Sequence, residues 1–411
     1  MRKKILIFLF LFTLLTLLGR GFITAVSIFK QSLTKEASPA NTKVLGIVTP
    51  AQSNLCKNYT KIVLPDNSYS GKEIQNNIGY KNNKVGLYVY SVDNFIIKAS
   101  EAVNNNGGDW GYVLIPYNIE EYDSNKWNKI FTLLRQQRLI PIIQLWGETK
   151  DYSDVEDRIK DSAEFLNSLN WPIKNRYISV FNEMNDKNFW GKGVDPSGYA
   201  TILNLTIKEY KKQSEDFFIL NGAFNASART GSNHLSADEY MIRMDKKVPG
   251  IFKKLDGWAS HPYPHINGYR GLPTDTGRDS IRAYEWELDI LKEKFGVKDL
   301  PVFITETGWP HAEGKKVDTN HYPDEIAAKY LKQAFENVWL PDDRVVAITP
   351  FTIKYDPPFD HFSFIKQDGG EYKIYKALKS LKKVSGKPPL NKVYDPLEEY
   401  CKKVRENNKD N

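Results

Sequence analysis

Two glutamates lie near the ends of apolar runs that have the character of buried strands. Glu183 lies in the run RYISVFNEMN, and Glu306 lies in the run VFITETGWP. A carboxylate beside a dry core is costly unless water or hydrogen bonds satisfy it. One such glutamate can cap the amides of a loop, but two at the ends of two strands raise the question of whether they act together.

A pair of carboxyl groups can break a glycosidic bond when they lie about 5–5.5 Å apart. One carboxylic acid protonates the leaving oxygen, while the other carboxylate attacks the anomeric carbon and forms a covalent intermediate. The surroundings must separate the two pKa values, so that one group stays protonated and the other ionised. The pair therefore predicts this chemistry, provided that the two strands face each other.

The two strands belong to a pattern of eight units between residues 85 and 383. Each unit is a short apolar strand followed by an amphipathic helical pattern, from VGLYVY with DNFIIKASEAV to VVAITPFTIK with EYKIYKALKSL. Strands that are apolar on both faces and alternate with helices form parallel sheets. Eight such units close into a (β/α)8 TIM barrel, whose site lies at the carboxyl ends of the strands. An open doubly wound sheet would need a Gly-rich loop after its first strand, and VGLYVYSVDN has none.

These motifs resemble those of the clan A retaining glycoside hydrolases, especially the cellulase-like and β-1,3-glucanase-like members. Asn182-Glu183 matches the Asn-Glu pair that ends strand four in that clan, and Glu306 in ITETGWP matches the glutamate that ends strand seven. His261 and Tyr263 in HPYP resemble the His-x-Tyr of cellulase-like members. The resemblance covers the barrel and implies Glu183 as acid/base and Glu306 as nucleophile.

The resemblance also implies roles for the neighbouring residues. Asn182 is expected to donate to the sugar 2-hydroxyl, Tyr263 to hydrogen-bond the nucleophile, and His261 to contact sugar. The chain departs from the clan in two places, because strand two ends in IPYN without an arginine and strand eight reads TPFTIKY without a tryptophan. Phe351 or Tyr355 would have to supply the floor for the sugar.

Four aromatic residues are expected to bind substrate, because flat apolar sugar faces stack on rings. Trp146 ends strand three, Trp190 lies in the loop after strand four, Trp309 follows the second glutamate, and Tyr355 follows strand eight. The alternative for each ring is packing at the rim of the barrel, since aromatic residues also dominate protein cores.

No cofactor, metal or nucleic acid is expected. The first strand, GLYVY, lacks the His-x-His of metal-dependent barrels, and HPYPH has no adjacent carboxylate ligand. The 57 basic and 50 acidic residues leave a net charge of +7 that is dispersed along the chain. Dispersed charge of this kind is typical of a solvated surface and not of a nucleic-acid stripe.

The N-terminus predicts export. MRKK precedes the apolar run ILIFLFLFTLLTLL, and no Ala-x-Ala cleavage site follows, so residues 1–30 are expected to form a signal peptide or an uncleaved signal anchor. The remainder would lie outside the cell or on its surface, with the membrane as a partner if the segment is retained. We expect a linker and extension over 31–84 and a polar tail over 384–411, with Cys56 and Cys401 either paired or free.

Three functions stay open at this point. The favoured one is a retaining glycoside hydrolase that acts on the β-glycosidic bonds of a poly- or oligosaccharide. A transglycosylase that remodels a cell-surface glycan would use the same covalent intermediate. A catalytically inactive carbohydrate-binding barrel is the third, because a fold does not imply activity and the strand-two arginine is missing.

Overall fold

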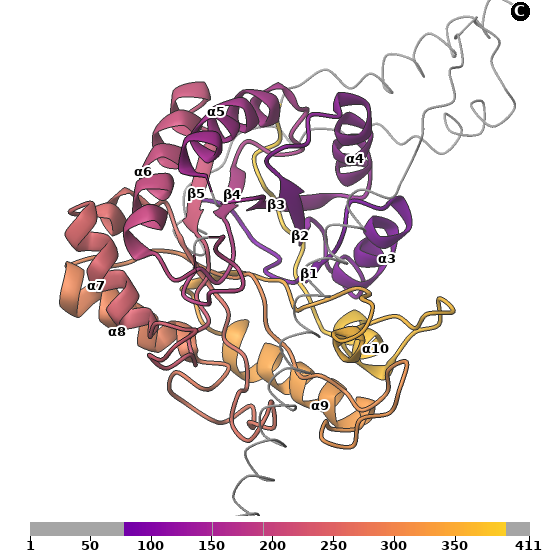
Figure 1. The fold of residues 1–411 in the computed structure, drawn as a ribbon. Helices are drawn as coiled ribbons and strands as arrows, with labels where there is room; N and C mark the ends of the chain where they lie inside the picture. Colours follow the sequence, from indigo (N-terminus) through magenta and orange to yellow (C-terminus); the bar gives the residue numbers. More distant parts are fainter. Residues whose placement is uncertain (1–77, 150, 192, 392–411) are drawn as a thin grey trace, which may run out of the picture. The chain divides into compact units, whose positions relative to one another are not determined.

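The computed structural model describes residues 78–149, 151–191 and 193–391, in which parallel strands alternate with helices (Figure 1). The strands are β1 (Gly86–Tyr88), β2 (Gly111–Asn118), β3 (Leu139–Trp146), β4 (Arg176–Val180), β5 (Phe217–Asn221), β6 (Trp258–Ser260), β7 (Val302–Ile304) and β8 (Val345–Ile348). The helices are α3 (Asp93–Val103), α4 (Ser124–Gln136), α5 (Tyr152–Ser168), α6 (Pro196–Gln213), α7 (Ala237–Lys247), α8 (Ala283–Phe295), α9 (Asp324–Ala334) and α10 (Lys373–Ser380). Short turns of other helix types are η1 (Ile251–Lys254), η2 (Phe335–Trp339) and η3 (Asp360–Phe362). The expected order of eight strand–helix units is therefore present.

The strands form two parallel sheets that follow the order of a TIM barrel. One sheet has five strands in the order β1-β2-β3-β4-β5, and the other has three in the order β6-β7-β8. Single bridges join the sheets, from Leu220 to Gly257 and from Val85 to Ile348. The ladder of a closed barrel is thus interrupted at two seams, which the sequence pattern did not predict.

A side chain takes over the pairing at the seam between β5 and β6. Oδ1 of Asn221 accepts the Ala259 N–H at 2.8 Å, and its Nδ2 donates to the Ala259 carbonyl at 3.1 Å. These bonds satisfy buried backbone groups that would otherwise lack a partner. Because Ala259 precedes His261 by two residues, this seam lies next to one of the predicted site residues.

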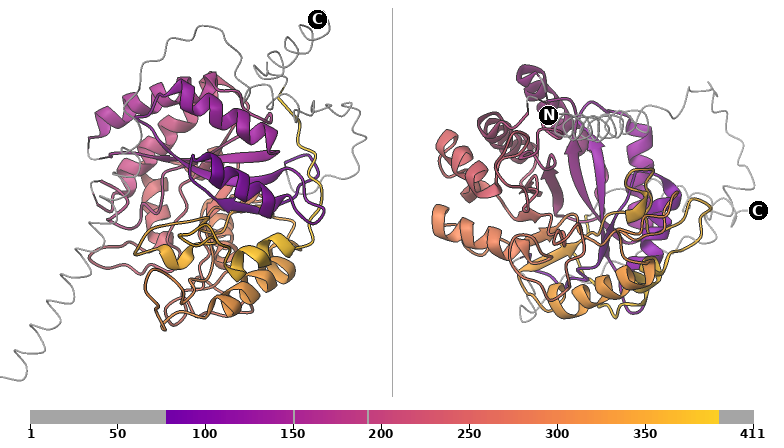
Figure 2. Two further views of the ribbon diagram at one scale, coloured as in Figure 1. Left: turned by 90° about the vertical axis from the view of Figure 1, so that its right-hand side faces the viewer. Right: turned by 60° about the horizontal axis from the view of Figure 1, so that its bottom comes forward.

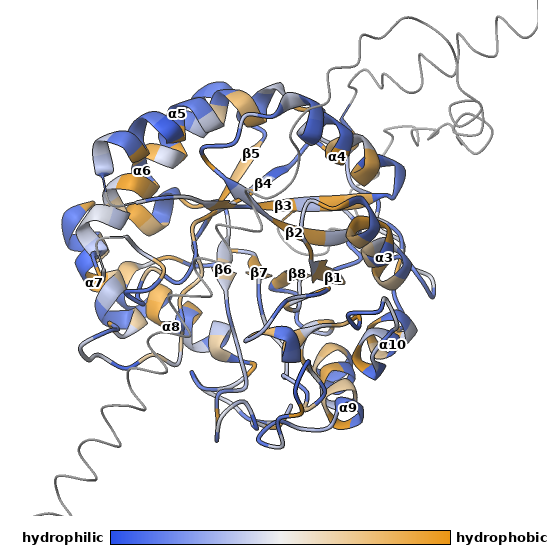
Figure 3. Cartoon of the chain, turned by 45° about the vertical axis from the view of Figure 1, so that its right-hand side comes forward, coloured by the Kyte–Doolittle hydropathy of each residue, from blue (hydrophilic) through white to orange (hydrophobic). Residues whose placement is uncertain are grey.

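Helices cover the outside of the strands, as two further views show (Figure 2). The helices carry both hydrophobic and hydrophilic residues, whereas β2 and β3 are largely hydrophobic (Figure 3). Helix starts are fixed locally, since Asp123 accepts from the Lys126 N–H and Asp195 from the Gly198 N–H. Such caps satisfy amides that have no partner within the helix.

Aromatic rings fill the interior at the amino ends of the strands. Tyr177 packs on Tyr112 and Phe303 with ring centroids 6.1 Å and 5.0 Å apart. The Tyr80 hydroxyl hydrogen-bonds those of Tyr112 and Tyr177 at 3.0 Å and 2.9 Å. This end of the interior is a packed core, which leaves the carboxyl ends of the strands for a site.

The described contacts extend on both sides of the predicted barrel range. Lys84 donates to the carbonyls of Leu340 and Asp342, and the Gly386 N–H donates to the Asp109 carbonyl. Residues 356–359 form a separate short turn. The predicted signal or anchor over 1–30, Cys56 and Cys401 lie outside the described residues. No helix in the described part of the chain is both long and apolar enough to cross a membrane.

Candidate active site

The chain after β4 turns sharply to present Glu183. Phe181 and Glu183 have φ values of 68° and 39°, in the left-handed region that side chains other than glycine rarely adopt. Such a conformation costs on the order of 1–3 kcal/mol and persists only where the surroundings enforce it. The Phe181 ring packs against Trp190 at 5.3 Å, and the Glu183 N–H donates to the Ala223 carbonyl at 2.9 Å.

A buried asparagine holds this turn against the next loop. Asn185 is fully buried, and its Nδ2 donates to the carbonyls of Asn225 and Leu235, both at 3.0 Å. Its Oδ1 accepts the Asn225 N–H at 3.0 Å. These bonds account for the second asparagine of the FNEMN run, which fixes the backbone that carries the carboxylate.

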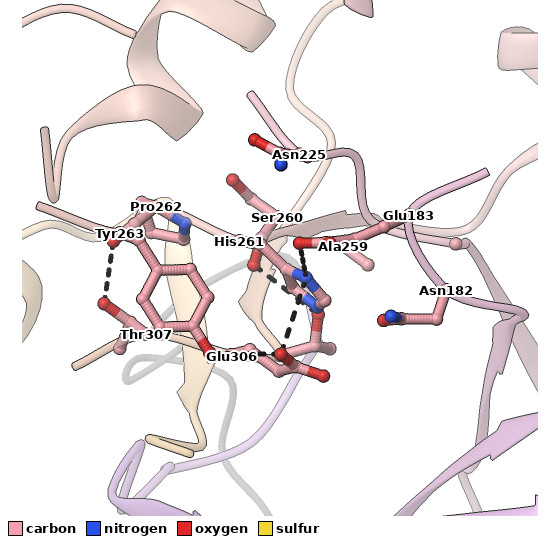
Figure 4. Close-up of polar contacts among 12 residues, drawn as sticks. Asn182, Glu183, Asn225, Ala259, Ser260, His261, Pro262, Tyr263, Glu306 and Thr307 are labelled. Atoms are coloured by element: carbon pink, nitrogen blue, oxygen red, sulfur yellow. Dashed lines mark hydrogen bonds and ion pairs between the residues drawn. The ribbon is translucent and has the colours of Figure 1, made fainter. Parts of the chain in front are cut away.

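His261 lies between the two predicted carboxylates (Figure 4). Its Nδ1 is 3.1 Å from Oε1 of Glu183 and 3.8 Å from Oε2 of Glu306. Because both distances meet at one nitrogen, these two oxygens lie no farther apart than their sum, about 6.9 Å. The residues after β4 and β7 are therefore brought together from opposite sides of the mouth.

Tyr263 also contacts the carboxylate of Glu306. Its hydroxyl donates to Oε2 of Glu306 at 3.1 Å, as Figure 4 shows. The loop that carries Tyr263 is tied to β7, because Thr307 Oγ1 donates to the Pro262 carbonyl at 2.7 Å. The hydroxyl is thus held in place to favour the charged form of the carboxylate.

Burial dominates the electrostatics of Glu306, which is 9% exposed. Burial raises the pKa of Glu306 to about 7, and the charge of Glu183 adds to the rise. His261 and hydrogen bonds from Tyr263 and Gln144 act in the opposite direction and lower this pKa. Burial is thus the main reason that Glu306 holds its proton more tightly than a free carboxyl group.

The proton affinity of His261 is set by the two carboxylates. Burial disfavours its cation, but the charge of Glu306 and the hydrogen bond and charge of Glu183 outweigh this effect and raise the pKa of His261. A protonated imidazole between the two carboxylates offsets part of their mutual repulsion. His261, which follows β6, is therefore the group whose positive charge lowers the pKa of Glu306.

A glutamine in β3 organises the opposite side of the mouth. Gln144 is fully buried, and its Nε2 donates to Oδ1 of Asn182 at 3.0 Å. Trp146 Nε1 donates to Oε1 of Gln144 at 2.8 Å, and the Tyr88 hydroxyl donates to the same oxygen at 3.3 Å. Asn182 is thus positioned beside Glu183 by a residue that the sequence analysis did not single out. A lone polar residue inside the apolar run LIPIIQLW was the available signal.

Aromatic rings surround the carboxylates on the β6 and β8 sides. Tyr355 is half-buried and packs against Tyr90 and Phe351 with centroids 5.8 Å and 5.6 Å apart. Tyr269 packs edge-on to Tyr263 at 5.8 Å. Burial raises the pKa of the Tyr269 phenol, and the charges of both glutamates add to the rise. Tyr355 is thus available at the mouth, and Tyr269 is a further ring near the site that the sequence analysis missed.

The three predicted tryptophans have different positions. Trp146 is half-buried and bonded to Gln144, next to the carboxylate side of the mouth. Trp309 is 0% exposed, and its Nε1 donates to the Gly271 carbonyl at 2.7 Å. Trp190 is 1% exposed, and its Nε1 donates to the Tyr152 hydroxyl at 2.9 Å. Both rings are buried in the structure and present no exposed face, and substrate stacking by Trp190 and Trp309 stays a prediction.

The remaining titratable groups near the loops do not form a metal site. Among the described residues, no group of three or more His, Cys, Asp or Glu side chains is arranged to hold a metal ion. His311 is fully buried, and its Nε2 lies 2.9 Å from the Ser363 carbonyl. His265 packs on Tyr263 and Tyr269, and burial lowers its pKa.

The fold is similar to that of solved glycosidases. A monomeric β-xylosidase from Caulobacter crescentus CB15 aligns with a TM-score of 0.52 at 14% identity, over 73% of this chain and 69% of that chain. A glucosidase from Croceicoccus marinus gives a TM-score of 0.50 at 12% identity, over 74% of this chain and 67% of that chain. No protein-family model and no curated protein sequence matches this chain. The resemblance to glycosidase barrels is confirmed for the fold, and identities this low establish the fold alone.

Proposed function

We propose that this protein is a retaining glycoside hydrolase that cleaves β-glycosidic bonds. The observation that carries the proposal is the position of Glu183 and Glu306, both within 4 Å of His261 Nδ1. Their nearest oxygens are at most about 6.9 Å apart. That limit is compatible with the roughly 5–5.5 Å separation of the two carboxyl groups in retaining enzymes.

The reaction has two steps. The Glu306 carboxylate attacks the anomeric carbon while Glu183 gives its proton to the leaving oxygen, so that the glycosidic bond breaks and a glycosyl ester forms. Glu183 then takes a proton from water, whose oxygen attacks the same carbon and releases Glu306. Tyr263 and protonated His261 favour the ionised form of Glu306 in the first step and after release, because both lower its pKa.

The surroundings favour an uncharged sugar. Among the described residues, His261 is the cationic group within ion-pair distance of either glutamate. The rings of Tyr269 and Tyr355 supply apolar faces of the kind on which neutral sugars stack.

The test is product release from neutral β-glucans, mannans, xylans and galactans. The full chain is compared with Glu306→Gln and with a control variant, Glu336→Gln. The control makes the same change at an exposed glutamate in η2. We expect products from the native protein and Glu336→Gln, and none from Glu306→Gln. Equal rates for all three proteins would refute the nucleophile assignment.

Product analysis also separates the alternatives. Oligomers longer than the starting material, detected by mass spectrometry, would identify a transglycosylase. Saturable binding without product from the native protein would identify a carbohydrate-binding barrel. Export is a further proposal, based on residues 1–30, and N-terminal peptide mapping of protein from cell fractions tests both the location and the cleavage.

A further inference from the structure

An amide side chain can be turned by 180° with little change in shape, so its direction must be set by a neighbour of fixed polarity. Trp146 is such a neighbour of Gln144, because an indole N–H donates and cannot accept. Its Nε1 lies 2.8 Å from Oε1 of Gln144. The oxygen of the glutamine must therefore face Trp146, and its NH2 group must face the other way.

The remaining bonds of Gln144 agree with this direction. Its Oε1 also accepts from the Tyr88 hydroxyl, and its Nε2 donates to Oδ1 of Asn182 at 3.0 Å. The same amide also lowers the pKa of the Glu306 carboxyl group. The side chain is fully buried, its oxygen accepts two hydrogen bonds and its NH2 group donates one, so a reversed orientation would be costly.

The orientation of the Gln144 amide also fixes the orientation of the Asn182 amide. Its oxygen is occupied by Gln144, and no described residue accepts a hydrogen bond from its Nδ2. Asn182 precedes Glu183, whose oxygen lies within about 6.9 Å of Glu306. The asparagine therefore faces the site with a donor group and not with an acceptor.

We propose that Gln144 is a positioning residue that fixes the Asn182 amide, so that its NH2 group meets an acceptor on C2 of the sugar between Glu183 and Glu306. This inference rests on the proposed glycosidase function. A hydrogen bond to the 2-hydroxyl strengthens in the transition state. Gln144 should therefore act on the rate of the chemical step through Asn182, without touching the substrate itself.

The experiment compares kcat/KM for an aryl β-glycoside and its 2-deoxy analogue. The proteins are the native chain, Gln144→Leu and Gln144→Glu, with Tyr263→Phe as a control on the opposite side of the site. Intrinsic differences in reactivity cancel when the ratio of the two substrates is compared between proteins. The ratio is kcat/KM for the aryl β-glycoside divided by kcat/KM for the 2-deoxy analogue. We expect this ratio to be about tenfold lower in both Gln144 variants than in the native chain, because the substitutions slow only the substrate that has the 2-hydroxyl.

Tyr263→Phe should slow both substrates alike and keep the native ratio. An unchanged ratio in Gln144→Leu and Gln144→Glu, whatever their absolute rates, would overturn the inference and leave the glycosidase proposal intact. Thermal melting of each variant separates a loss of fold from a loss of positioning.

A second readout needs no turnover. Calorimetry compares an iminosugar that carries the 2-hydroxyl with one that lacks it, on the same set of proteins. A preference for the hydroxyl that is lost in Gln144→Glu supports the inference even if the native chain is inactive. Absence of any preference in the native chain overturns it, while inactivity toward every glycoside counts against the proposed function instead.

Discussion

The two sides of the candidate site are built from different kinds of groups. On the β3–β4 side, Trp146, Gln144 and Asn182 form a chain of hydrogen bonds from groups that do not titrate. On the β6–β7 side, His261 and Glu306 are both buried, and each shifts the pKa of the other. One side therefore has a fixed polarity, and the other holds protons that can move.

Under the proposed function, this difference gives the two sides separate tasks. A fixed chain of donors can orient a neutral sugar without responding to pH. Glu183 comes from the first side but reaches His261 on the second, because the left-handed backbone after β4 turns it there. The proton chemistry thus depends on a few residues after β4, β6 and β7, and changes there should have the largest effects.

After the complete loss of turnover proposed for Glu306→Gln, the largest effect is expected for Glu183→Ala. Loss of the general acid and base should lower kcat/KM by about 10²–10⁴ for substrates with poor leaving groups. Azide should restore turnover with an activated aryl glycoside and give the β-glycosyl azide, because an anionic nucleophile needs no general base. Full activity without azide, or a lack of rescue with an activated substrate, would contradict the role of Glu183.

His261→Asn should have the next largest effect. His261 lowers the pKa of Glu306, so its removal should raise that pKa further and shift the acidic limb of the pH–rate profile to higher pH. At pH 6 we expect kcat/KM to fall about tenfold or more, with partial recovery at pH 8. A uniform loss at all pH values would indicate a structural role instead.

Tyr263→Phe should shift the same limb in the same direction but by less. The hydrogen bond from Tyr263 lowers the pKa of Glu306, and its contribution is smaller than that of the His261 charge. The measurement is kcat/KM from pH 4 to pH 9 for both variants side by side. A larger shift for Tyr263→Phe than for His261→Asn would show that the order of the two effects is wrong.

The smallest effect on activity is expected for Glu287→Gln, behind β6. Burial raises the pKa of Glu287 to about 7, and the carboxyl accepts the Trp258 indole N–H at 2.9 Å. A carboxyl group with a raised pKa keeps its proton in the folded state, so the free energy of unfolding falls as pH rises from about 4.5 to about 7.

Glutamine keeps the acceptor for Trp258 and removes the titration. Urea unfolding at pH 5 and pH 7 gives the fall in the free energy of unfolding between these two pH values. This fall should be smaller in Glu287→Gln than in the native protein, by on the order of 1–3 kcal/mol. The same pH dependence in the native protein and in Glu287→Gln would mean that Glu287 does not titrate in this range.

Much of the fold could be predicted from the sequence because its signal is local. Apolar runs alternate with helical periodicity in eight units, and the structure has eight strands and eight helices in that order within the described residues. The seams could not be predicted. The seam between β5 and β6 depends on the Asn221 side chain, which replaces a backbone bond, and no local pattern marks that replacement.

The sequence by itself determined which residues stand at the ends of the strands, and so placed Glu183, His261, Tyr263 and Glu306 at one mouth. Only the tertiary structure decided that His261 lies between the two carboxylates and that Trp190 and Trp309 are buried. Local sequence patterns are enough to predict the order of the strands. Burial and shared hydrogen bonds instead depend on residues that are distant in the chain. The glutamine of β3 has a role for this same reason, since Trp146, Tyr88 and Asn182 meet it only when the strands lie side by side.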